Sequence, residues 1–128
     1  MILLDTHAWI WWMNSPSSLS RKVQARLRDE KEVAVSAISC WEIAMLIAKG
    51  RLELDRDVLL WISQSLAQPR MSLVPLLPEI AVAASRLGVA FPGDPGDRII
   101  YSTARHLGWR LVTRDDGIRK HDPELTFW

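Results

Sequence analysis

The sequence has little of several features that would tie a protein to one environment. Its 128 residues contain a single cysteine, Cys40, so no disulfide can form within the chain and a reducing compartment is expected. No run of about 18 apolar residues occurs, which argues against a membrane-spanning helix. The first residues lack the basic segment of a secretory signal, and Asp5 interrupts the apolar segment that would follow. We therefore expect a cytoplasmic protein with no membrane partner.

An excess of charge of either sign is also missing. Sixteen Lys and Arg residues face fifteen Asp and Glu residues, so a formal net charge of +1 gives no general reason to expect a polyanionic partner. Hydrophobic residues make up 48% of the chain and charged residues 24%, which are the proportions of an ordinary folded protein. A chain of this length suits a single domain with its own core, and we expect residues 1–128 to form one.

Several short motifs of catalysis and nucleotide binding are absent as well. The chain has no G-x-G-x-x-G dinucleotide fingerprint, no phosphate-loop lysine, no H-E-x-x-H and no G-x-S-x-G. The three histidines, His7, His106 and His121, lack the spacing of metal ligands, and we interpret them as helix-surface or loop residues. Any chemistry must therefore come from other residue types.

What the chain does contain is an alternation of short apolar strands with amphipathic helices. Helices are expected to begin near capping residues such as Ser20, Ser39 and Asp55 and to end at Gly50 and Gly108. Strands are expected at residues 2–4, 33–35, 73–76, 111–112 and 125–127. This alternation predicts a three-layer α/β/α sandwich around a mainly parallel central sheet.

Four acids stand where such a fold binds its ligands, beyond the carboxyl ends of parallel strands. Asp5 directly follows the first strand, and Asp115 follows the strand at 111–112. Glu42 lies in the first turn of a helix after the second strand, and Asp97 opens another helix after a Gly-Asp-Pro-Gly loop. Two like charges about 4 Å apart repel by roughly 4 kcal/mol near a protein surface. A hard divalent cation, Mg²⁺ or Mn²⁺, would offset that repulsion.

Each of these acids taken singly also has a purely structural explanation. Glu42 could complete a capping box with Ser39, and Asp97 could cap its own helix. Asp115 lies in an Asp-Asp-Gly sequence that is typical of a turn. Asp5 has the weakest such explanation, because apolar residues surround it on both sides and few solvated positions remain.

Taken together and in order, the acid-bearing segments resemble those of the PIN-domain ribonucleases, and most closely the VapC-type toxins of bacterial toxin–antitoxin pairs. The matching segments are Asp5-Thr6-His7 after ILL, Glu42 within SAISCWEIA, Asp97 within GDPGDRIIYSTA and Asp115 within LVTRDDGI. The resemblance covers essentially the whole chain. No single segment is specific, but the ordered set of four is.

The resemblance implies an α/β/α domain whose acidic pocket binds Mg²⁺ or Mn²⁺ and hydrolyses RNA phosphodiester bonds. It implies a homodimer and an antitoxin of the VapB type that blocks the site. Carried over by motif, the catalytic and metal-binding acids would be Asp5, Glu42, Asp97 and Asp115. The supporting residues would be Thr6, Thr113, Asp94 and Asp116. The aspartate pair at 115–116 leaves the identity of the fourth ligand open.

Two further groups have alternative interpretations. Arg98 and Arg114 could steer the RNA backbone, or could pair with Asp94 or Asp116. Three tryptophans on one short helix cannot all point inward, so the segment could pack in the core and also form a partner face. The partner-face candidates are Trp9, Trp11 and Trp12.

Three other functions compete with that of a ribonuclease. A phosphoryl-accepting receiver domain has a similar size and Mg²⁺-binding acids, but needs adjacent acids after the first strand and a late lysine, where this chain has Thr6-His7 and Thr113-Arg114. A D-x-D phosphohydrolase fails because His7 stands where its second aspartate belongs. A non-catalytic binding module stays open, although all four acids are present.

Overall fold

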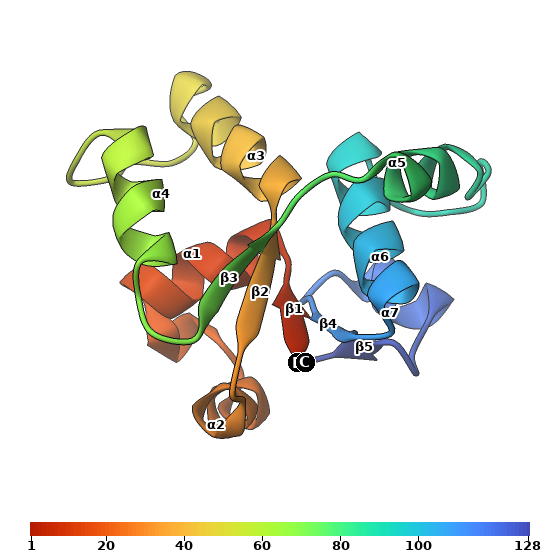
Figure 1. Ribbon diagram of the computed structural model, residues 1–128, viewed down its shortest axis with the longest axis horizontal. Coiled ribbons are helices and arrows are strands. Elements are labelled where there is room, and N and C mark those ends of the chain that lie inside the picture. Colours follow the sequence, from red (N-terminus) through yellow and green to blue (C-terminus); the bar gives the residue numbers. More distant parts are fainter.

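The computed structural model describes residues 1–128 and contains one five-stranded sheet in which every neighbouring pair is parallel. The strand order is β3-β2-β1-β4-β5, with β1 in the centre (Figure 1). The strands are β1 (Ile2–Leu4), β2 (Val33–Ser36), β3 (Met71–Val74), β4 (Arg110–Val112) and β5 (Thr126–Phe127). The expectation of a mainly parallel sheet is confirmed.

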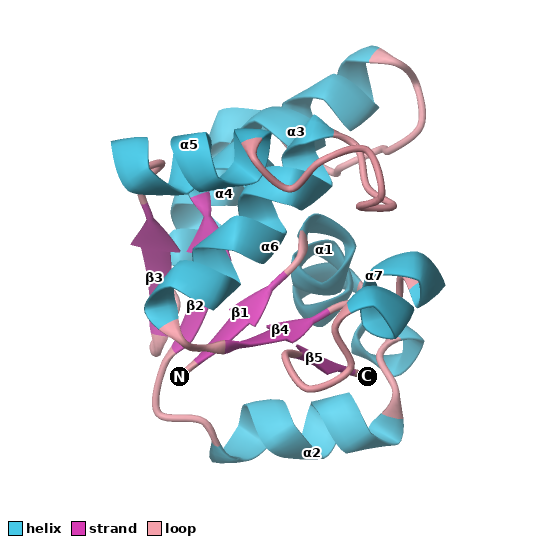
Figure 2. Ribbon diagram, turned by 90° about the vertical axis from the view of Figure 1, so that its right-hand side faces the viewer, coloured by secondary structure: helices cyan, strands magenta, loops and turns pink.

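Helices cover both faces of the sheet, as the three-layer prediction requires (Figures 1 and 2). One layer holds α1 (Thr6–Asn14), α2 (Arg21–Asp29), α3 (Ala37–Ala48) and α4 (Val58–Leu66), with a short 3₁₀ turn at Pro16–Ser18. The other layer holds α5 (Pro78–Ser85), α6 (Pro95–Leu107) and α7 (Asp116–His121). None of these helices is long and apolar enough to cross a membrane.

The alternation of side chains along the strands divides the core in two. In β1, Ile2 and Leu4 pack with the first helical layer, whereas Leu3 packs with the second. All three are fully buried, and this is why a strand covered on both faces reads as an unbroken apolar run. Trp9 of α1 is also fully buried, and its indole N–H donates to Ser65 Oγ of α4 at 2.7 Å.

The strand order places a switch of direction beside β1. The chain leaves β1 towards β2 and β3, then returns to build β4 and β5 on the other side. The connections that follow β1 and β4 therefore run to opposite sides. This leaves a crevice at the carboxyl ends of these two strands. Asp5 continues the pairing at that point, because its backbone N–H donates to Val112 O at 3.0 Å.

Two predicted boundaries are wrong for identifiable reasons. The third strand ends at Val74 rather than continuing to residue 76, because Pro75 has no N–H to donate to the sheet. Helix α4 is capped by Asp57, whose Oδ2 accepts from the backbone N–H of Leu59 and Leu60, and not by Asp55. The Asp55 side chain instead pairs with Arg56.

Two other helix starts differ in ways that affect the acids. Helix α3 begins after Ser36, whose Oγ accepts from Ile38 N, so Ser39 lies inside the helix and does not cap it. The Asp-Asp-Gly sequence after β4, for which a turn was the structural alternative, opens helix α7 with Asp115 as its cap. The glycine terminator of α6 is confirmed, because Gly108 adopts the left-handed conformation with φ of 69°.

Candidate active site

A pocket of about 500 Å³ opens at the carboxyl ends of β1 and β4, in the crevice beside the switch of direction. Five of its nine lining residues carry carboxylates, and only one is an arginine. The lining consists of Asp5, Thr6, His7, Trp11, Glu42, Asp94, Asp97, Arg114 and Asp115. The fold therefore brings all four acids that the sequence singled out to one hollow, although they come from four segments.

Asp5 lies at the carboxyl end of β1, where it is the N-cap residue of α1. Its Oδ1 accepts a 2.8 Å hydrogen bond from the backbone N–H of Ala8. Burial raises the pKa of the Asp5 carboxyl above its usual range, while the Ala8 N–H and the Thr113 hydroxyl act against that rise. The second carboxylate oxygen takes no part in the cap, and Asp5 lines the pocket.

Glu42 lies on α3 and is tied to the start of α1 by a side-chain hydrogen bond. The hydroxyl of Thr6 donates to Glu42 Oε1 at 2.5 Å and lies 2.9 Å from the Oγ of buried Ser39. Burial raises the pKa of Glu42, and the bond from Thr6 partly offsets it. The capping-box explanation of Glu42 is therefore wrong, since Thr6 and Ser39 position the side chain from within the fold.

Gly96 lets the Glu42 carboxylate lie directly against the first turn of α6. A Cβ added at Gly96 would come within 2.6 Å of Glu42 Cδ, which is closer than side chains pack. A side chain at this position would therefore force the Glu42 carboxylate to move. The sequence shows a glycine directly before Asp97, but it does not indicate that Glu42 is the residue that contacts it.

Asp94 and Asp97 form a reciprocal capping box at the start of α6. Asp94 Oδ1 accepts from the backbone N–H of Asp97 at 2.8 Å, and Asp97 Oδ2 accepts from the backbone N–H of Asp94 at 3.3 Å. Burial raises the pKa of Asp97 to about 7, and the neighbouring charges of Asp94 and Glu42 add to the rise. The cap of α6 is Asp94, so the alternative in which Asp97 is itself the cap is wrong.

Asp115 reaches the pocket from the opposite side, beyond β4. Its backbone N–H donates to Thr113 Oγ1 at 3.1 Å, and its Oδ1 accepts from Ile118 N at 2.9 Å. Thr113 is fully buried beneath the pocket floor. Its hydroxyl accepts from the Asp115 backbone and acts against the rise in the pKa of Asp5, which fits a supporting position.

The donor chemistry of the pocket fits a hard divalent cation. The available donors are carboxylate oxygens, and burial raises the pKa of three of the acids, so keeping them ionised together is costly without a compensating charge. No three His, Cys, Asp or Glu side chains converge as ligands of one ion as the chain stands. The pocket therefore offers negative charge and oxygen donors rather than a closed cage.

Two residues expected near the site lie elsewhere. Asp116 is exposed on α7, where it pairs with Arg119 at 3.4 Å, and it does not line the acidic pocket. Arg98 turns away from the pocket, with its guanidinium near the Phe91 ring and its N–H groups directed at the carbonyls of Phe91 and Gly93. Arg98 forms no ion pair with Asp94 or Asp116, because its hydrogen bonds are to backbone carbonyls, while its contact with RNA stays a prediction.

The remaining candidates divide between pocket and core. Arg114 lines the pocket, with its guanidinium carbon 6.0 Å from the ring centre of Trp11, which lines it as well. Trp9 is fully buried, so the expectation that it forms a partner face is wrong. Trp12 is only half-buried and lies outside the acidic pocket. His7 also lines the pocket. The spacing of the three histidines gave no indication of this, because it was assessed only for metal ligands.

Similarity to known proteins agrees with this geometry. Residues 2–123 match the PIN domain family. The chain is 40% identical to Ribonuclease VapC22 of Mycobacterium tuberculosis, over 99% of this chain and 98% of that protein.

Solved structures with the same fold come from several bacteria. One is VapBC2 from Rickettsia felis bound to a DNA fragment from its promoter, at a TM-score of 0.73 and 16% identity over 99% of this chain and 98% of that one. Another is a toxin–antitoxin complex from Klebsiella pneumoniae, at a TM-score of 0.70 and 19% identity over 100% and 97% of the two chains. With the family matched over nearly all its length and a 40% identical relative, this chain belongs to the PIN domain family.

Proposed function

We propose that the chain is a divalent-metal-dependent endoribonuclease and the toxin of a bacterial toxin–antitoxin pair, acting in the cytoplasm. Membership of the PIN domain family and the ribonuclease name of the 40% identical relative support the activity. The observation that carries the proposal is the single pocket into which four separate segments deliver Asp5, Glu42, Asp97 and Asp115.

The proposed metal is Mg²⁺ or Mn²⁺, held by the oxygens of Asp5, Glu42, Asp97 and Asp115. A divalent ion bound there would reverse the negative field of the pocket, polarise the phosphoryl group and favour attack by water. Without that positive charge the pocket would repel an RNA phosphodiester, because its five carboxylates face one arginine.

The chain's own residues would orient the acids and the substrate. Thr6 holds Glu42 in place by donating to one of its oxygens, and Asp94 fixes Asp97 by the capping box. Arg114, exposed at the rim and close to Trp11, would attract an RNA phosphate towards the acids. No histidine or lysine is required as a base in this scheme.

The proposed partners are an antitoxin of the VapB type and a second copy of the chain. The fold neighbours include toxin–antitoxin complexes, which supports the first. The half-buried Trp12 and the exposed apolar residues of α4, Leu59 and Leu60, supply surface that a partner could cover. Antitoxin binding would inhibit the enzyme by covering the pocket.

The experiment that tests the function is RNA cleavage by the purified chain with and without a divalent ion. We expect total RNA to be cut in Mg²⁺ or Mn²⁺, no cutting in EDTA, and no cutting by Asp5→Asn in either. A folded wild-type chain that cuts no RNA in either ion would contradict the proposal and favour a non-catalytic binding module. Labelling of the chain by acetyl phosphate would instead indicate a receiver-type phosphoacceptor.

A further inference from the structure

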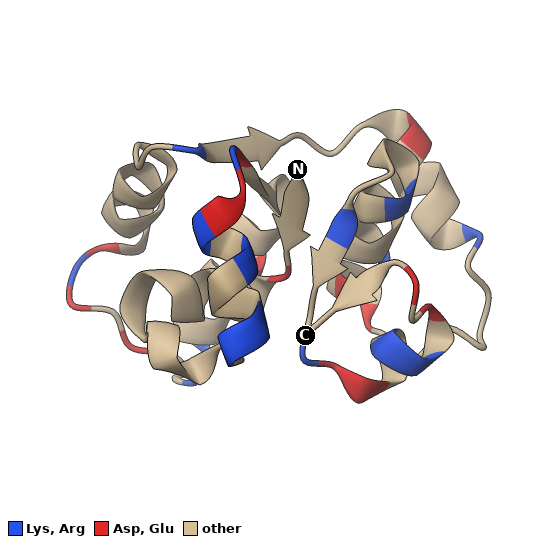
Figure 3. Cartoon of the chain, turned by 90° about the horizontal axis from the view of Figure 1, so that it is seen from below, with Lys and Arg blue, Asp and Glu red and all other residues tan.

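A second polar pocket, of about 410 Å³, lies away from the acids, between α2, α7 and the sheet edge at β5. Its lining includes four cationic side chains, Lys22, Arg110, Arg119 and Lys120, and one acid, Asp116. We call this group of four the basic pocket. Figure 3 shows blue ribbon segments on both sides of the C-terminal end of the chain, where this pocket lies.

The charges of the basic pocket are left largely uncompensated by the protein. Arg119 pairs with Asp116, but Lys22, Arg110 and Lys120 form no ion pair. The buried Nε of Arg110 has no hydrogen-bond partner, although its Nη2 donates to Thr126 O. Cations that are gathered without acids repel one another, and a buried N–H without an acceptor is costly. An anion with several acceptor oxygens would relieve the mutual repulsion of the cations, although the buried Nε of Arg110 itself is out of its reach.

The ring of Phe127 lies beside two cations of the basic pocket, Lys22 and Arg110, and beside Arg26 of α2. The Nζ of Lys22 lies 4.6 Å from the centre of the Phe127 ring, and the guanidinium carbons of Arg110 and Arg26 lie 5.0 Å and 5.6 Å from it. Attraction to the ring favours these positions in spite of the mutual repulsion. Phe127 itself is buried at the end of β5, so the cations are arranged around a fixed point.

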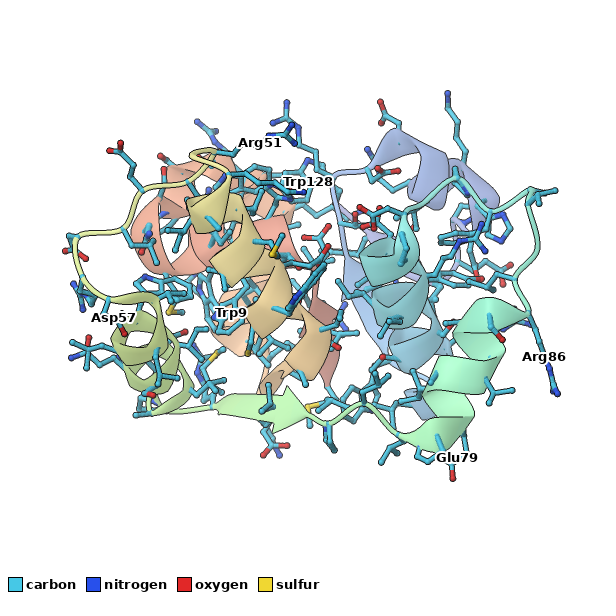
Figure 4. All side chains as sticks on the ribbon, turned by 90° about the horizontal axis from the view of Figure 1, so that it is seen from above. Trp9, Arg51, Asp57, Glu79, Arg86 and Trp128 are labelled. Atoms are coloured by element: carbon cyan, nitrogen blue, oxygen red, sulfur yellow. The ribbon has the colours of Figure 1, made fainter.

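An aromatic and cationic path connects the basic pocket with the acidic one. Arg114 and Trp11 line the acidic pocket and lie close to each other. The ring centre of Trp11 is 5.9 Å from that of Trp128, and Trp128 lines the basic pocket. Figure 4 shows Trp9 among the helices of the first layer and Trp128 near the margin of the molecule. Alternating cations and partly exposed aromatic rings are the features that bind single-stranded nucleic acid.

We propose that the basic pocket binds backbone phosphates of the RNA strand on one side of the scissile bond, while Trp11 and Trp128 stack with bases between the two pockets. The inference rests on the proposed ribonuclease function, and it assigns that function an extended single-stranded substrate. Phosphate oxygens would accept hydrogen bonds from Arg110 and Arg119 and neutralise Lys22 and Lys120. The extra contacts would supply affinity that the acidic pocket cannot.

The test separates binding from cleavage. Binding of a fluorescein-labelled 20-nucleotide single-stranded RNA of mixed sequence is measured by anisotropy in EDTA, where cleavage is excluded. We expect Lys22→Ala/Lys120→Ala to bind about tenfold or more weakly, and to lower the slope of log affinity against log salt by about 0.7 for each lost phosphate contact. The control, Arg21→Ala/Arg28→Ala, removes two exposed charges of α2 outside the basic pocket and should bind as the wild type does.

The stacking part of the inference has its own variants. Trp128→Ala should weaken binding about fivefold or more, whereas Trp128→Phe keeps an aromatic face and should retain most of the affinity. In the presence of Mn²⁺, Lys22→Ala/Lys120→Ala should raise KM for the long RNA with little change in kcat, because the acidic pocket is untouched. A short RNA that spans only the acidic pocket should be cut equally by the variant and the wild type.

The outcomes distinguish the inference from the function beneath it. If the wild type cuts RNA and Lys22→Ala/Lys120→Ala matches it in affinity, salt slope and KM, the basic pocket does not bind RNA and the inference is overturned. If the two lysines matter for binding a poly-glutamate peptide but not for binding RNA, the pocket takes an acidic protein segment and the inference is likewise overturned. If the wild type cuts no RNA with either ion, the proposed function fails, and the inference fails with it even where binding in EDTA depends on the lysines.

Discussion

Thr6 at the start of α1 donates a hydrogen bond of 2.5 Å to Glu42 on α3, 36 residues further along the chain. The bond joins the element that carries Asp5 to the element that carries the next acid. Thr6 is almost wholly buried, and its hydroxyl also lies 2.9 Å from the Ser39 hydroxyl. The geometry of the acidic pocket therefore depends on a neutral side chain as well as on the acids.

Replacing Thr6 by valine tests that dependence. Thr6→Val keeps the shape of the side chain but removes the donor, so one oxygen of Glu42 loses its partner and its orientation. We expect affinity for Mn²⁺ and the RNA cleavage rate to fall by roughly 10–100-fold while the fold is retained. Metal titration measures the affinity, a cleavage assay measures the rate, and circular dichroism checks the fold. Thr6→Ser restores the hydroxyl and should recover most of the activity; equal activity of all three chains would show that Thr6 does not position Glu42.

Asp5→Asn should abolish metal-dependent RNA cleavage and leave the fold intact. Asparagine can still cap α1, so the cap contributes a change of less than about 1 kcal/mol. Since burial raises the pKa of Asp5, removing its charge should maintain or increase the melting temperature in EDTA. Asp57→Asn, at the cap of α4 and outside the acidic pocket, is the matched control and should remain active. Full activity of Asp5→Asn would refute the assignment of Asp5.

Gly96→Ala should disturb Glu42 directly. The added Cβ would overlap the Glu42 carboxylate, so the carboxylate should move out of place and cleavage should fall, while the free energy of unfolding changes by less than about 1 kcal/mol. Urea denaturation measures the free energy of unfolding. Glu42→Ala removes the carboxylate, so adding Gly96→Ala to it should cause no further loss of cleavage. Additive losses would mean that the two residues do not compete for the same space.

The pKa of Asp97, raised to about 7, predicts how stability depends on pH without metal. The folded chain binds a proton at Asp97 over a range, from about pH 4 to 7, in which the unfolded chain has released it. Stability in EDTA should therefore fall as the pH rises through this range, by roughly 1–3 kcal/mol. Asp97→Asn should flatten the profile, and Mn²⁺ should restore stability at pH 8 by compensating the charge. A wild-type profile that is flat or rises with pH would contradict this prediction.

Trp12 tests the partner face that remains after Trp9 proved to be buried. Trp12 is half-buried, and its ring lies 5.8 Å from the guanidinium carbon of Arg70. If it contacts a second copy or the antitoxin, Trp12→Ala should weaken assembly by about 2 kcal/mol, as measured by light scattering and calorimetry. Val89→Ala, at a fully exposed loop position, serves as the control. Unchanged assembly of both Trp11→Ala and Trp12→Ala would remove this helix from the interfaces.

The strand–helix alternation and the positions of the four acids could be predicted because both are written in local patterns. A strand that is buried on both faces consists of apolar residues, so an acid directly after Leu4 stands out in the sequence. Helix boundaries were less accurate, since Asp55 and Asp57 are both good caps and only the packing of α4 selects one. Asp116 and Arg98 lie outside the acidic pocket for a similar reason, because a neighbour of a pocket residue along the chain can point to the opposite side.

The fold class, the buried strands and the set of acids can be predicted from local sequence pattern, because periodicity and acid placement depend on neighbours a few residues apart. The strand order, the contact of Glu42 with Thr6 and Gly96, and the packing of Trp11 against Trp128 depend on the tertiary packing. These join residues tens of positions apart. Their proximity follows from how the helices pack on the sheet, and short-range pattern in the chain carries no record of that packing.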